Sequence, residues 1–453
     1  MNTIIVLLII NFINFSICDP IELRGVVEGF YGTPWTFEHR ADIVTFESKN
    51  NLNSYIYAPK DDPYHREDWR IPYPDDIIQQ LQNLISTATQ NSVKFIFAVS
   101  PGLDLDYDSE DDFNALMAKL DSLYQVGCRY FAIFFDDITA EPGDGKKQAL
   151  FLNKLQDALD TKYSDSNPLI TVPTQYCIQH MIDDQGNVKE YTQDMVNYLD
   201  EKITVLYTGD RVVSDGISDE SYKMATDIYK RSLGIWWNYP VNDYLPMKLA
   251  LGPIEKLPTA NVKSIFYNPM GQVQLSKICL ATGGDYAMSP DNYDPFASWD
   301  KAINAQFGDL APAMKVFATH SRHMEKSDTI KCGPADAPEF YEEGHQAVLD
   351  YQAQIPHDYT LLQDLIDEME NSCSTLLNEL QEDLLAECNV QLQQFLRIIF
   401  TDKVALKSLK EQMLDARLVD LRNEIASFES VARVSELSAV KFIDEVIELF
   451  GGK

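Results

Sequence analysis

Two adjacent acidic residues, Asp136 and Asp137, follow the apolar run YFAIFF at Tyr130–Phe135. Two carboxylates close together in a partly dry pocket disfavour joint ionisation, so we expect the pKa of one to rise. The carboxyl that carries a proton could act as a general acid while its charged neighbour orients a substrate dipole. The pair is a candidate catalytic site, although an Asp-Asp pair at a strand end is also typical of a helix N-cap in a solvated turn.

Metal and serine-nucleophile chemistry are the other classes that an acidic pair suggests. A divalent cation at this pair would need further oxygen ligands from other loops, and that alternative stays open from the residues alone. The seven His residues are scattered and no CxxC pair occurs, which argues against zinc. Because the chain also has no G-x-S-x-G elbow, a serine hydrolase is not indicated. We expect no metal and no cofactor.

The acidic pair follows one of several apolar runs that alternate along the chain with amphipathic helical stretches. Continuous hydrophobicity, rather than alternation, is typical of strands buried on both faces, as in parallel sheets. The run starts lie about 29 to 41 residues apart. The eight runs are 23–31, 53–58, 94–99, 130–135, 169–172, 203–207, 233–237 and 262–267. Eight β-then-α units at near-even spacing predict a (β/α)8 barrel, which we place at residues 19–295.

The remaining chain, residues 296–453, predicts a helical domain. Leucine and isoleucine recur at helical spacing over Leu361–Leu377 and Leu384–Phe400, and the last proline is Pro356. These apolar stripes indicate the core of a helical bundle. An exposed stripe that forms a dimer contact is the alternative, so the oligomeric state stays open. The six cysteines beyond Cys18 permit up to three disulfides in an exported chain.

The N-terminal residues 1–18 resemble a secretory signal peptide. Ile4–Ile10 is apolar, and small residues at Ser16 and Cys18 suit cleavage before Asp19. The run is short for a membrane span, which needs about 20 residues. We therefore expect a secreted protein or one that resides in an endomembrane or vacuolar lumen, without membrane attachment after cleavage.

The charge balance limits the classes of molecule that the protein is expected to bind. The chain has 453 residues, with 70 Asp and Glu against 37 Lys and Arg, and the formal net charge is −33. Such a field repels nucleic-acid backbones and anionic lipid surfaces. The residues just past the predicted strands are instead carboxylates, amides and aromatics with one Lys, a mixture that suits a neutral ligand with many hydroxyls.

Five segments carry a resemblance to a known family. They are GVVEGFYGTPW (25–35), YAPKDDPYHREDWR (57–70), FAIFFDDI (131–138), IWWNYPVNDY (235–244) and YNPM (267–270). In this order the segments resemble glycoside hydrolase family 84, the retaining β-N-acetylglucosaminidases that include protein O-GlcNAcases. The resemblance implies that GlcNAc-bearing glycans or glycoproteins are the partners.

The resemblance implies that the 2-acetamido group of the substrate acts as the nucleophile and forms an oxazoline, an exception to the two-carboxylate scheme. Asp136 would bind the acetamide N–H. Asp137 would protonate the leaving oxygen and then deprotonate the incoming water. Neighbouring side chains on a strand point to opposite faces, so both can face the sugar only if the chain bends at the strand end.

Four residues carry over by motif as ligands of the sugar hydroxyls. Gly29 would offer its backbone carbonyl at a place where a side chain would block approach, and Lys60 would donate to the same edge. Asp243 and Asn268 would hold the hydroxyls far from the scissile bond.

Four further residues carry over as the acetamide pocket. Tyr176 would hydrogen-bond the acetamide carbonyl, Thr208 and Trp236 would wall the acetyl group, and Asn238 would support the region. Because Trp236 and Trp237 alternate faces, one of them belongs to the core.

Three functions are compatible with these residues. The first is an exo-acting β-N-acetylglucosaminidase. The second is an endo-acting hyaluronidase, because some family relatives carry that label, although the charge of −33 disfavours a polyanionic substrate. The third is a non-catalytic sugar-binding protein, which the presence of both Asp136 and Asp137 disfavours.

Overall fold

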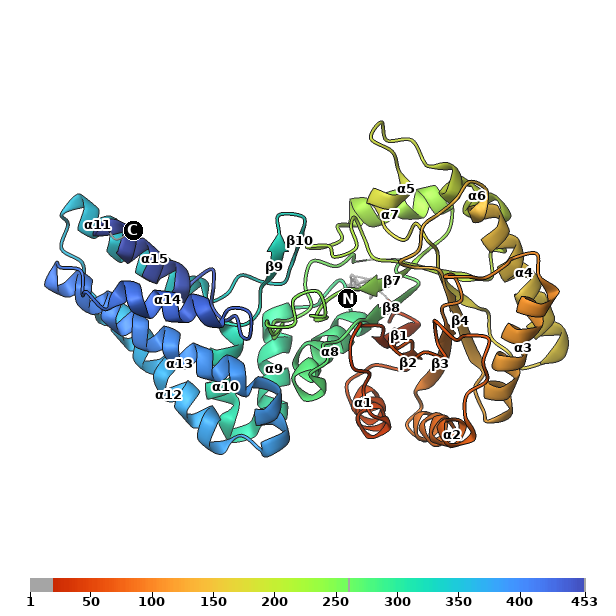
Figure 1. Ribbon diagram of the computed structural model, residues 1–453, viewed down its shortest axis with the longest axis horizontal. Coiled ribbons are helices and arrows are strands. Elements are labelled where there is room, and N and C mark those ends of the chain that lie inside the picture. Colours follow the sequence, from red (N-terminus) through yellow and green to blue (C-terminus); the bar gives the residue numbers. More distant parts are fainter. Residues whose placement is uncertain (1–18, 260, 452–453) are drawn as a thin grey trace, which may run out of the picture.

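The computed structural model describes residues 19–259 and 261–451, and its centre is a closed barrel of eight parallel strands (Figure 1). The predicted signal peptide, residues 1–18, lies outside the described residues. The strands are β1 (Leu23–Glu28), β2 (Ser54–Tyr57), β3 (Lys94–Val99), β4 (Tyr130–Phe134), β5 (Ile170–Val172), β6 (Thr204–Tyr207), β7 (Gly234–Trp237) and β8 (Ser264–Tyr267). β8 pairs with β1 and closes the sheet. The (β/α)8 prediction is confirmed.

The strands are buried on both faces, which explains their continuous apolar sequences. Side chains such as Val27, Ile56 and Phe134 fill the barrel interior, whereas their neighbours Val26 and Tyr55 pack under the surrounding helices. The alternation follows the two-residue period of a strand. Each strand therefore needs apolar residues at nearly every position.

Helices surround the barrel in the order that the amphipathic stretches predict. They are α1 (Phe37–Lys49), α2 (Asp75–Gln90), α3 (Glu110–Gln125), α4 (Asp144–Lys162), α5 (Ile178–Met181), α6 (Glu190–Tyr198), α7 (Asp219–Tyr229) and α8 (Val273–Met288). Thr36, Ser109 and Ser218 cap α1, α3 and α7 by accepting a backbone N–H.

The connection from β7 to β8 lacks the helix that the sequence pattern predicts. The described residues between Trp237 and Ser264 form no helix, so the seventh β-then-α unit is incomplete. The segment holds Pro240, Pro246, Pro253 and Pro258. Proline lacks the N–H that a helix interior requires and its ring clashes with the preceding turn, so this spacing prevents a long helix. The segment instead forms an extended loop at the pocket.

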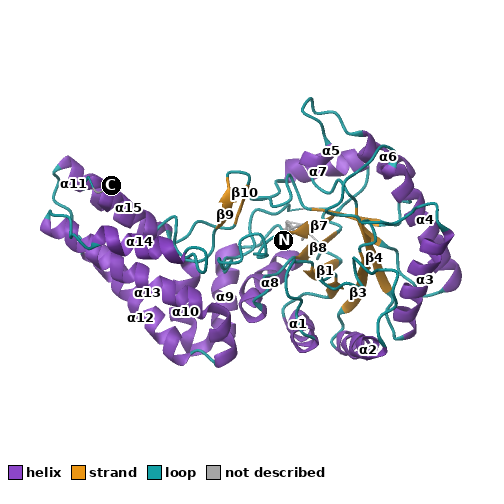
Figure 2. Cartoon of the chain, viewed as in Figure 1, coloured by secondary structure: helices purple, strands orange, loops and turns teal. Residues whose placement is uncertain are grey.

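The post-barrel region is helical, as predicted, and forms the elongated part of Figure 1 that is coloured from teal to blue. Its elements are α9 (Pro295–Phe307), η1 (Gly308–Leu310), α10 (Ala311–Thr319), β9 (Met324–Ser327), β10 (Ile330–Cys332), α11 (Pro338–Ala353), α12 (Thr360–Glu379), α13 (Glu382–Glu411), α14 (Leu418–Phe428) and α15 (Ala439–Leu449). The β9–β10 hairpin was not predicted. Figure 2 shows it as a short pair of strands between the barrel and the helices.

The six cysteines of the described residues are free and buried. Cys373 lies on α12 and Cys388 on α13, so the two are on separate helices. Burial raises the pKa of both thiols to about 12, which keeps them protonated and unreactive at neutral pH. Among the described residues, no helix is both long and apolar enough to cross a membrane.

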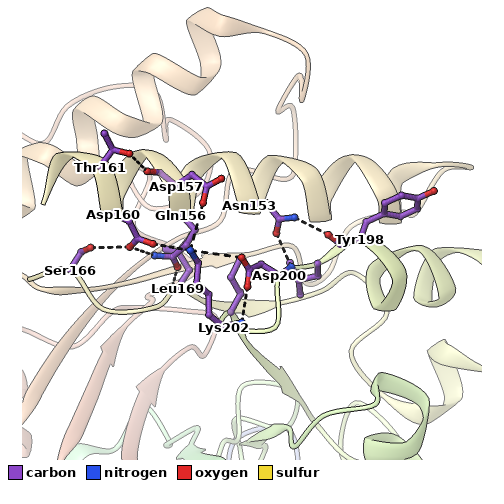
Figure 3. A network of polar contacts seen from close by, with 12 residues as sticks. Asn153, Gln156, Asp157, Asp160, Thr161, Ser166, Leu169, Tyr198, Asp200 and Lys202 are labelled. Atoms are coloured by element: carbon purple, nitrogen blue, oxygen red, sulfur yellow. Dashed lines mark hydrogen bonds and ion pairs between the residues drawn. The ribbon is translucent and has the colours of Figure 1, made fainter. Parts of the chain in front are cut away.

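A polar network on α4 holds the amino-terminal ends of β5 and β6 (Figure 3). The buried Gln156 side chain accepts a hydrogen bond from the backbone N–H of Leu169 at 2.6 Å and donates to Asp160 at 2.8 Å. On the same helix, Asn153 donates to the Tyr198 carbonyl at 2.8 Å and accepts from the backbone N–H of Asp200 at 2.9 Å. These bonds position the strands from the end opposite the catalytic face of a barrel.

We predict that Gln156→Leu lowers the free energy of unfolding by about 1–3 kcal/mol, because it leaves the buried Leu169 N–H without a partner. Urea-induced unfolding measures the change. Gln82→Leu, at an exposed position on α2, is the matched control and should shift the free energy by no more than about 0.5 kcal/mol. Equal midpoints for the two variants would contradict the role of Gln156.

Candidate active site

One pocket of about 300 Å³ opens at the carboxyl-terminal ends of the strands, the face that carries the active sites of barrel enzymes. All ten residues singled out from the sequence line it: Gly29, Lys60, Asp136, Asp137, Tyr176, Thr208, Trp236, Asn238, Asp243 and Asn268. They come from seven different strand ends, so only barrel closure brings them together. Their individual roles remain predictions.

A backbone bend lets both members of the acidic pair reach the pocket. β4 ends at Phe134, and Asp137 has a φ of 58°, in the left-handed region. This conformation is uncommon for a residue with a Cβ, but Asp tolerates it better than most. The bend replaces the strand alternation that would otherwise point Asp136 and Asp137 apart. Asp136 is only 9% exposed, whereas Asp137 is exposed at the rim.

Asp136 forms a buried ion pair with Lys60. The Lys60 Nζ contacts Asp136 Oδ2, and both side chains are nearly excluded from solvent. The other oxygen, Asp136 Oδ1, is buried and has no hydrogen-bond partner among the described residues. A buried carboxylate oxygen without a partner is costly, so it marks a place where a ligand donor would be stabilised.

Asp137 has a different environment. Its two oxygens accept hydrogen bonds of 2.7 Å from the hydroxyls of Tyr31 and Tyr176. Partial desolvation raises the pKa of Asp137, but these two hydrogen bonds and the charges of Lys60 and Arg66 outweigh it and lower the pKa. The sequence predicts a raised pKa for one of the two carboxyls, and Asp137 is not that one, because two donors stabilise its charged form.

The aromatic and amide groups at the pocket floor are interlocked. A Cβ at Gly29 would lie 2.3 Å from the Trp236 ring, so only glycine fits there. Trp236 Nε1 and Asn268 Nδ2 donate to Asn238 Oδ1 at 2.8 and 3.0 Å, and Asn238 Nδ2 donates to the Val212 carbonyl at 2.7 Å. Asn238 is therefore a structural centre of the floor rather than a simple turn residue.

The other predicted residues also have defined partners. Thr208 Oγ1 donates to the Arg211 carbonyl at 2.7 Å. Asp243 Oδ2 accepts the backbone N–H of Tyr31 at 2.8 Å, and burial raises the pKa of Asp243. Trp237 belongs to the outer core whereas Trp236 belongs to the inner cluster, as their alternation predicts.

Seven further residues line the pocket and were assigned no role from the sequence: Tyr31, Val172, Val212, Val213, Val241, Tyr244 and Ile330. Tyr31 lies directly after β1 in the motif GFYG, so its position past a strand end was a usable signal. Ile330 carried no such signal, because it belongs to the hairpin beyond the barrel. Within the residues that the structure describes, no group of three His, Cys, Asp or Glu side chains is placed to hold a metal ion.

We predict that Tyr31→Phe raises the pKa of Asp137, because the charged carboxylate loses a hydrogen-bond donor while the protonated form loses less. A carbon NMR titration of the aspartate carboxyls, assigned with Asp137→Asn, measures the shift. Tyr198→Phe removes an exposed phenol that bonds neither carboxylate and is the control. An Asp137 pKa that is the same in both variants would show that the Tyr31 hydroxyl does not hold this group ionised.

Two family models match the chain. The model described as β-N-acetylglucosaminidase matches residues 24–319, and the model described as hyaluronidase post-catalytic domain-like matches residues 348–443. Protein O-GlcNAcase from Mus musculus is 36% identical over 270 residues, and that from Rattus norvegicus is 35% identical over 268. Each match covers 57% of this chain but only 29% of the relative, so the chain spans less than a third of these proteins.

Solved structures extend the similarity through the helical domain. The structure of CpGH84B superimposes with a TM-score of 0.87 and 34% identity, covering 94% of this chain and 77% of that one. A mutant of Thermobaculum terrenum O-GlcNAc hydrolase gives a TM-score of 0.80 and 27% identity, covering 96% and 97%. With a matching catalytic model, a matching post-catalytic model and a pocket lined by all five motifs, the chain belongs to the glycoside hydrolase family 84 β-N-acetylglucosaminidases, the O-GlcNAcase family.

Proposed function

We propose that the protein is a retaining, exo-acting β-N-acetylglucosaminidase that removes terminal β-linked GlcNAc and uses the acetamide of the substrate as nucleophile. The observation that carries the proposal is the unequal environment of two adjacent carboxylates. Asp136 is buried beside Lys60 with one oxygen unpaired, and Asp137 stands exposed at the rim. A buried acetamide N–H requires a hydrogen-bond acceptor deep in the pocket, as Asp136 offers. A leaving group that faces solvent requires a carboxyl at the rim, as Asp137 offers.

In the first step, the acetamide oxygen attacks the anomeric carbon and an oxazoline forms as the glycosidic bond breaks. The acetamide nitrogen gains positive charge, and its N–H would donate to Asp136 Oδ1, the oxygen without a partner. The carboxylate of Asp136, held in place by its ion pair with Lys60, would then stabilise the positive charge of the oxazoline. The apolar walls of Val172 and Trp236 suit the acetyl methyl group.

Asp137 would donate its proton to the leaving oxygen in this step. In the second step it would take a proton from a water molecule that attacks the anomeric carbon and opens the oxazoline, which restores the acetamide. Two displacements at the same carbon give net retention. The hydroxyls of Tyr31 and Tyr176 stabilise the charged form of Asp137 and lower its pKa. A substrate in the pocket would exclude water from Asp137 and compete for the two tyrosine hydroxyls. Both changes would raise the pKa of Asp137, so that its carboxyl could be protonated and act as the general acid.

The remaining polar groups would bind the sugar hydroxyls and fix the ring. Asp243 and Asn268 offer a carboxylate and an amide on the side of β7 and β8, and Lys60 offers an ammonium on the side of β2. A pocket of about 300 Å³ is at the small end of ligand sites, so it suits one terminal sugar rather than an internal chain segment. This size supports exo action.

The natural substrate class follows from the relatives and the charge. The mouse and rat relatives are named Protein O-GlcNAcase, so GlcNAc on glycoproteins is the first candidate. The hyaluronidase-like description of the second family model keeps hyaluronan as the second candidate. A net charge of −33 repels that polyanion.

We predict that the protein releases 4-nitrophenol from its β-GlcNAc glycoside and leaves the viscosity of hyaluronan unchanged, because the pocket admits one neutral terminal sugar. Absorbance and viscometry measure the two activities. Loss of viscosity without glycoside cleavage would assign the endo activity. The absence of both, with retained binding of N-acetylglucosamine, would assign a sugar-binding protein.

We predict that Asp137→Asn keeps much more activity on the nitrophenyl glycoside than on an alkyl GlcNAc glycoside, because an activated phenol departs without protonation. Asp136→Asn should lose about 10²–10⁴-fold in kcat on both, since the internal nucleophile loses its partner. The two Asn variants are matched controls for each other. Equal sensitivity of Asp137→Asn to both leaving groups would overturn the assignment of roles.

A further inference from the structure

The β9–β10 hairpin supplies a pocket residue from outside the barrel. It occupies 324–332, between the two family matches at 24–319 and 348–443. Figure 1 shows it standing between the barrel and the helical domain. Ile330, at the start of β10, lines the same pocket as Asp136 and Asp137. The hairpin is thus an element of the site that neither family match covers.

The base of the hairpin is held rigidly. The buried Asp336 Oδ1 accepts the backbone N–H groups of Arg322 and His323 at 2.7 and 2.8 Å. Tyr239 donates to the Arg322 carbonyl at 2.9 Å. Lys248 Nζ lies 3.5 Å from Asp336, which ties the hairpin base to the loop after β7. These buried bonds fix the base of the hairpin against the loop after β7.

The strand β10 is tethered and bent where it meets the pocket. The Cys332 Sγ lies 3.5 Å from the hydroxyl of Tyr244, another pocket residue. The register of the two strands shifts between Ile330 and Lys331, which marks a bulge or irregularity. Such bulges re-aim a side chain and occur often beside active sites. Here the irregularity coincides with the one hairpin residue that lines the pocket.

Part of the pocket lining that is open to solvent is aromatic or aliphatic. Tyr31 is 42% exposed, Val212 is 39% exposed and Ile330 is half-buried, whereas the polar groups Asp136 and Asn268 lie deeper. A terminal sugar would occupy the deep part, so the group attached to it must pass the rim, where Asp137 is also exposed.

We propose that the hairpin forms part of the leaving-group subsite and that Ile330 is a specificity-determining residue that binds apolar or aromatic leaving groups. The proposal rests on the proposed function, which places the leaving oxygen beside Asp137. Ile330 would contact the apolar group that is attached to the sugar. Free N-acetylglucosamine ends at its anomeric hydroxyl and lacks this group. Ile330 therefore contributes to the binding of the glycoside and not to that of the sugar.

The test compares two ligands on one variant. Ile330→Ala should raise KM for the nitrophenyl β-GlcNAc glycoside about three- to tenfold, the effect of removing a half-buried apolar side chain. It should leave kcat and the inhibition constant of free N-acetylglucosamine unchanged. Ile330→Leu, which keeps the apolar volume, should restore KM. Thr329→Ala changes the neighbouring residue, which does not line this pocket, and should behave as the wild type.

Two results would overturn the proposal. An unchanged KM in Ile330→Ala would remove Ile330 from binding, and an equal loss of affinity for free N-acetylglucosamine would place it against the sugar itself. Calorimetric titration with phenyl β-GlcNAc and the free sugar gives the same comparison without turnover. A wild-type protein that binds but does not cleave would refute the proposed function while this comparison still decides the role of Ile330.

Discussion

A buried ion pair between Lys60 and Asp136 underlies the arrangement of the pocket. Removing two such ions from water costs several kcal/mol each, so the pair persists only where the surrounding structure fixes both groups and supplies compensating contacts. The strands β2 and β4 supply the two residues, and closure of the barrel brings the strand ends together. The pair leaves one carboxylate oxygen charged, dry and without a partner.

The two ends of the barrel have different tasks. At the amino-terminal ends of the strands, side-chain hydrogen bonds such as that of Gln156 hold the loops that lead into β5 and β6 (Figure 3). At the carboxyl-terminal ends, long irregular connections carry the polar and aromatic groups. The loop after β7 is the clearest case, because four prolines prevent a helix and leave Asn238, Asp243 and Tyr244 in the pocket wall.

The helical domain also contributes to the pocket, although it lies beside the barrel. Lys248, on the loop after β7, lies 3.1 Å from Glu436 of the helical domain and 3.5 Å from Asp336 at the hairpin base. This buried lysine joins the barrel, the hairpin and the helical domain at one point. The post-barrel chain therefore helps to position the hairpin whose residue Ile330 lines the pocket.

Much of this protein follows from its sequence alone. Strands buried on both faces require continuous apolar runs, so the eight strands were visible as such, and the parallel barrel followed from their spacing. Because a barrel gathers the carboxyl ends of its strands, residues near the ends of the runs were expected to share one pocket. The resemblance to family 84 selected ten residues there, and all ten line it. The missing seventh helix was not predicted, although the four prolines that prevent it are present in the sequence.

Only the tertiary structure decided the chemistry within that pocket. Asp137 bonds Tyr31, which is 106 residues away in the chain, and Tyr176, which is 39 residues away. These contacts lower its pKa, whereas the sequence predicted only that the pKa of one of the two carboxyls would rise and could not say which. Ile330 lines the pocket but belongs to a hairpin that the sequence pattern did not predict. Local patterns determine which segments become strands and helices, but protonation and the shape of the rim depend on contacts between distant residues, which exist only after the chain has folded.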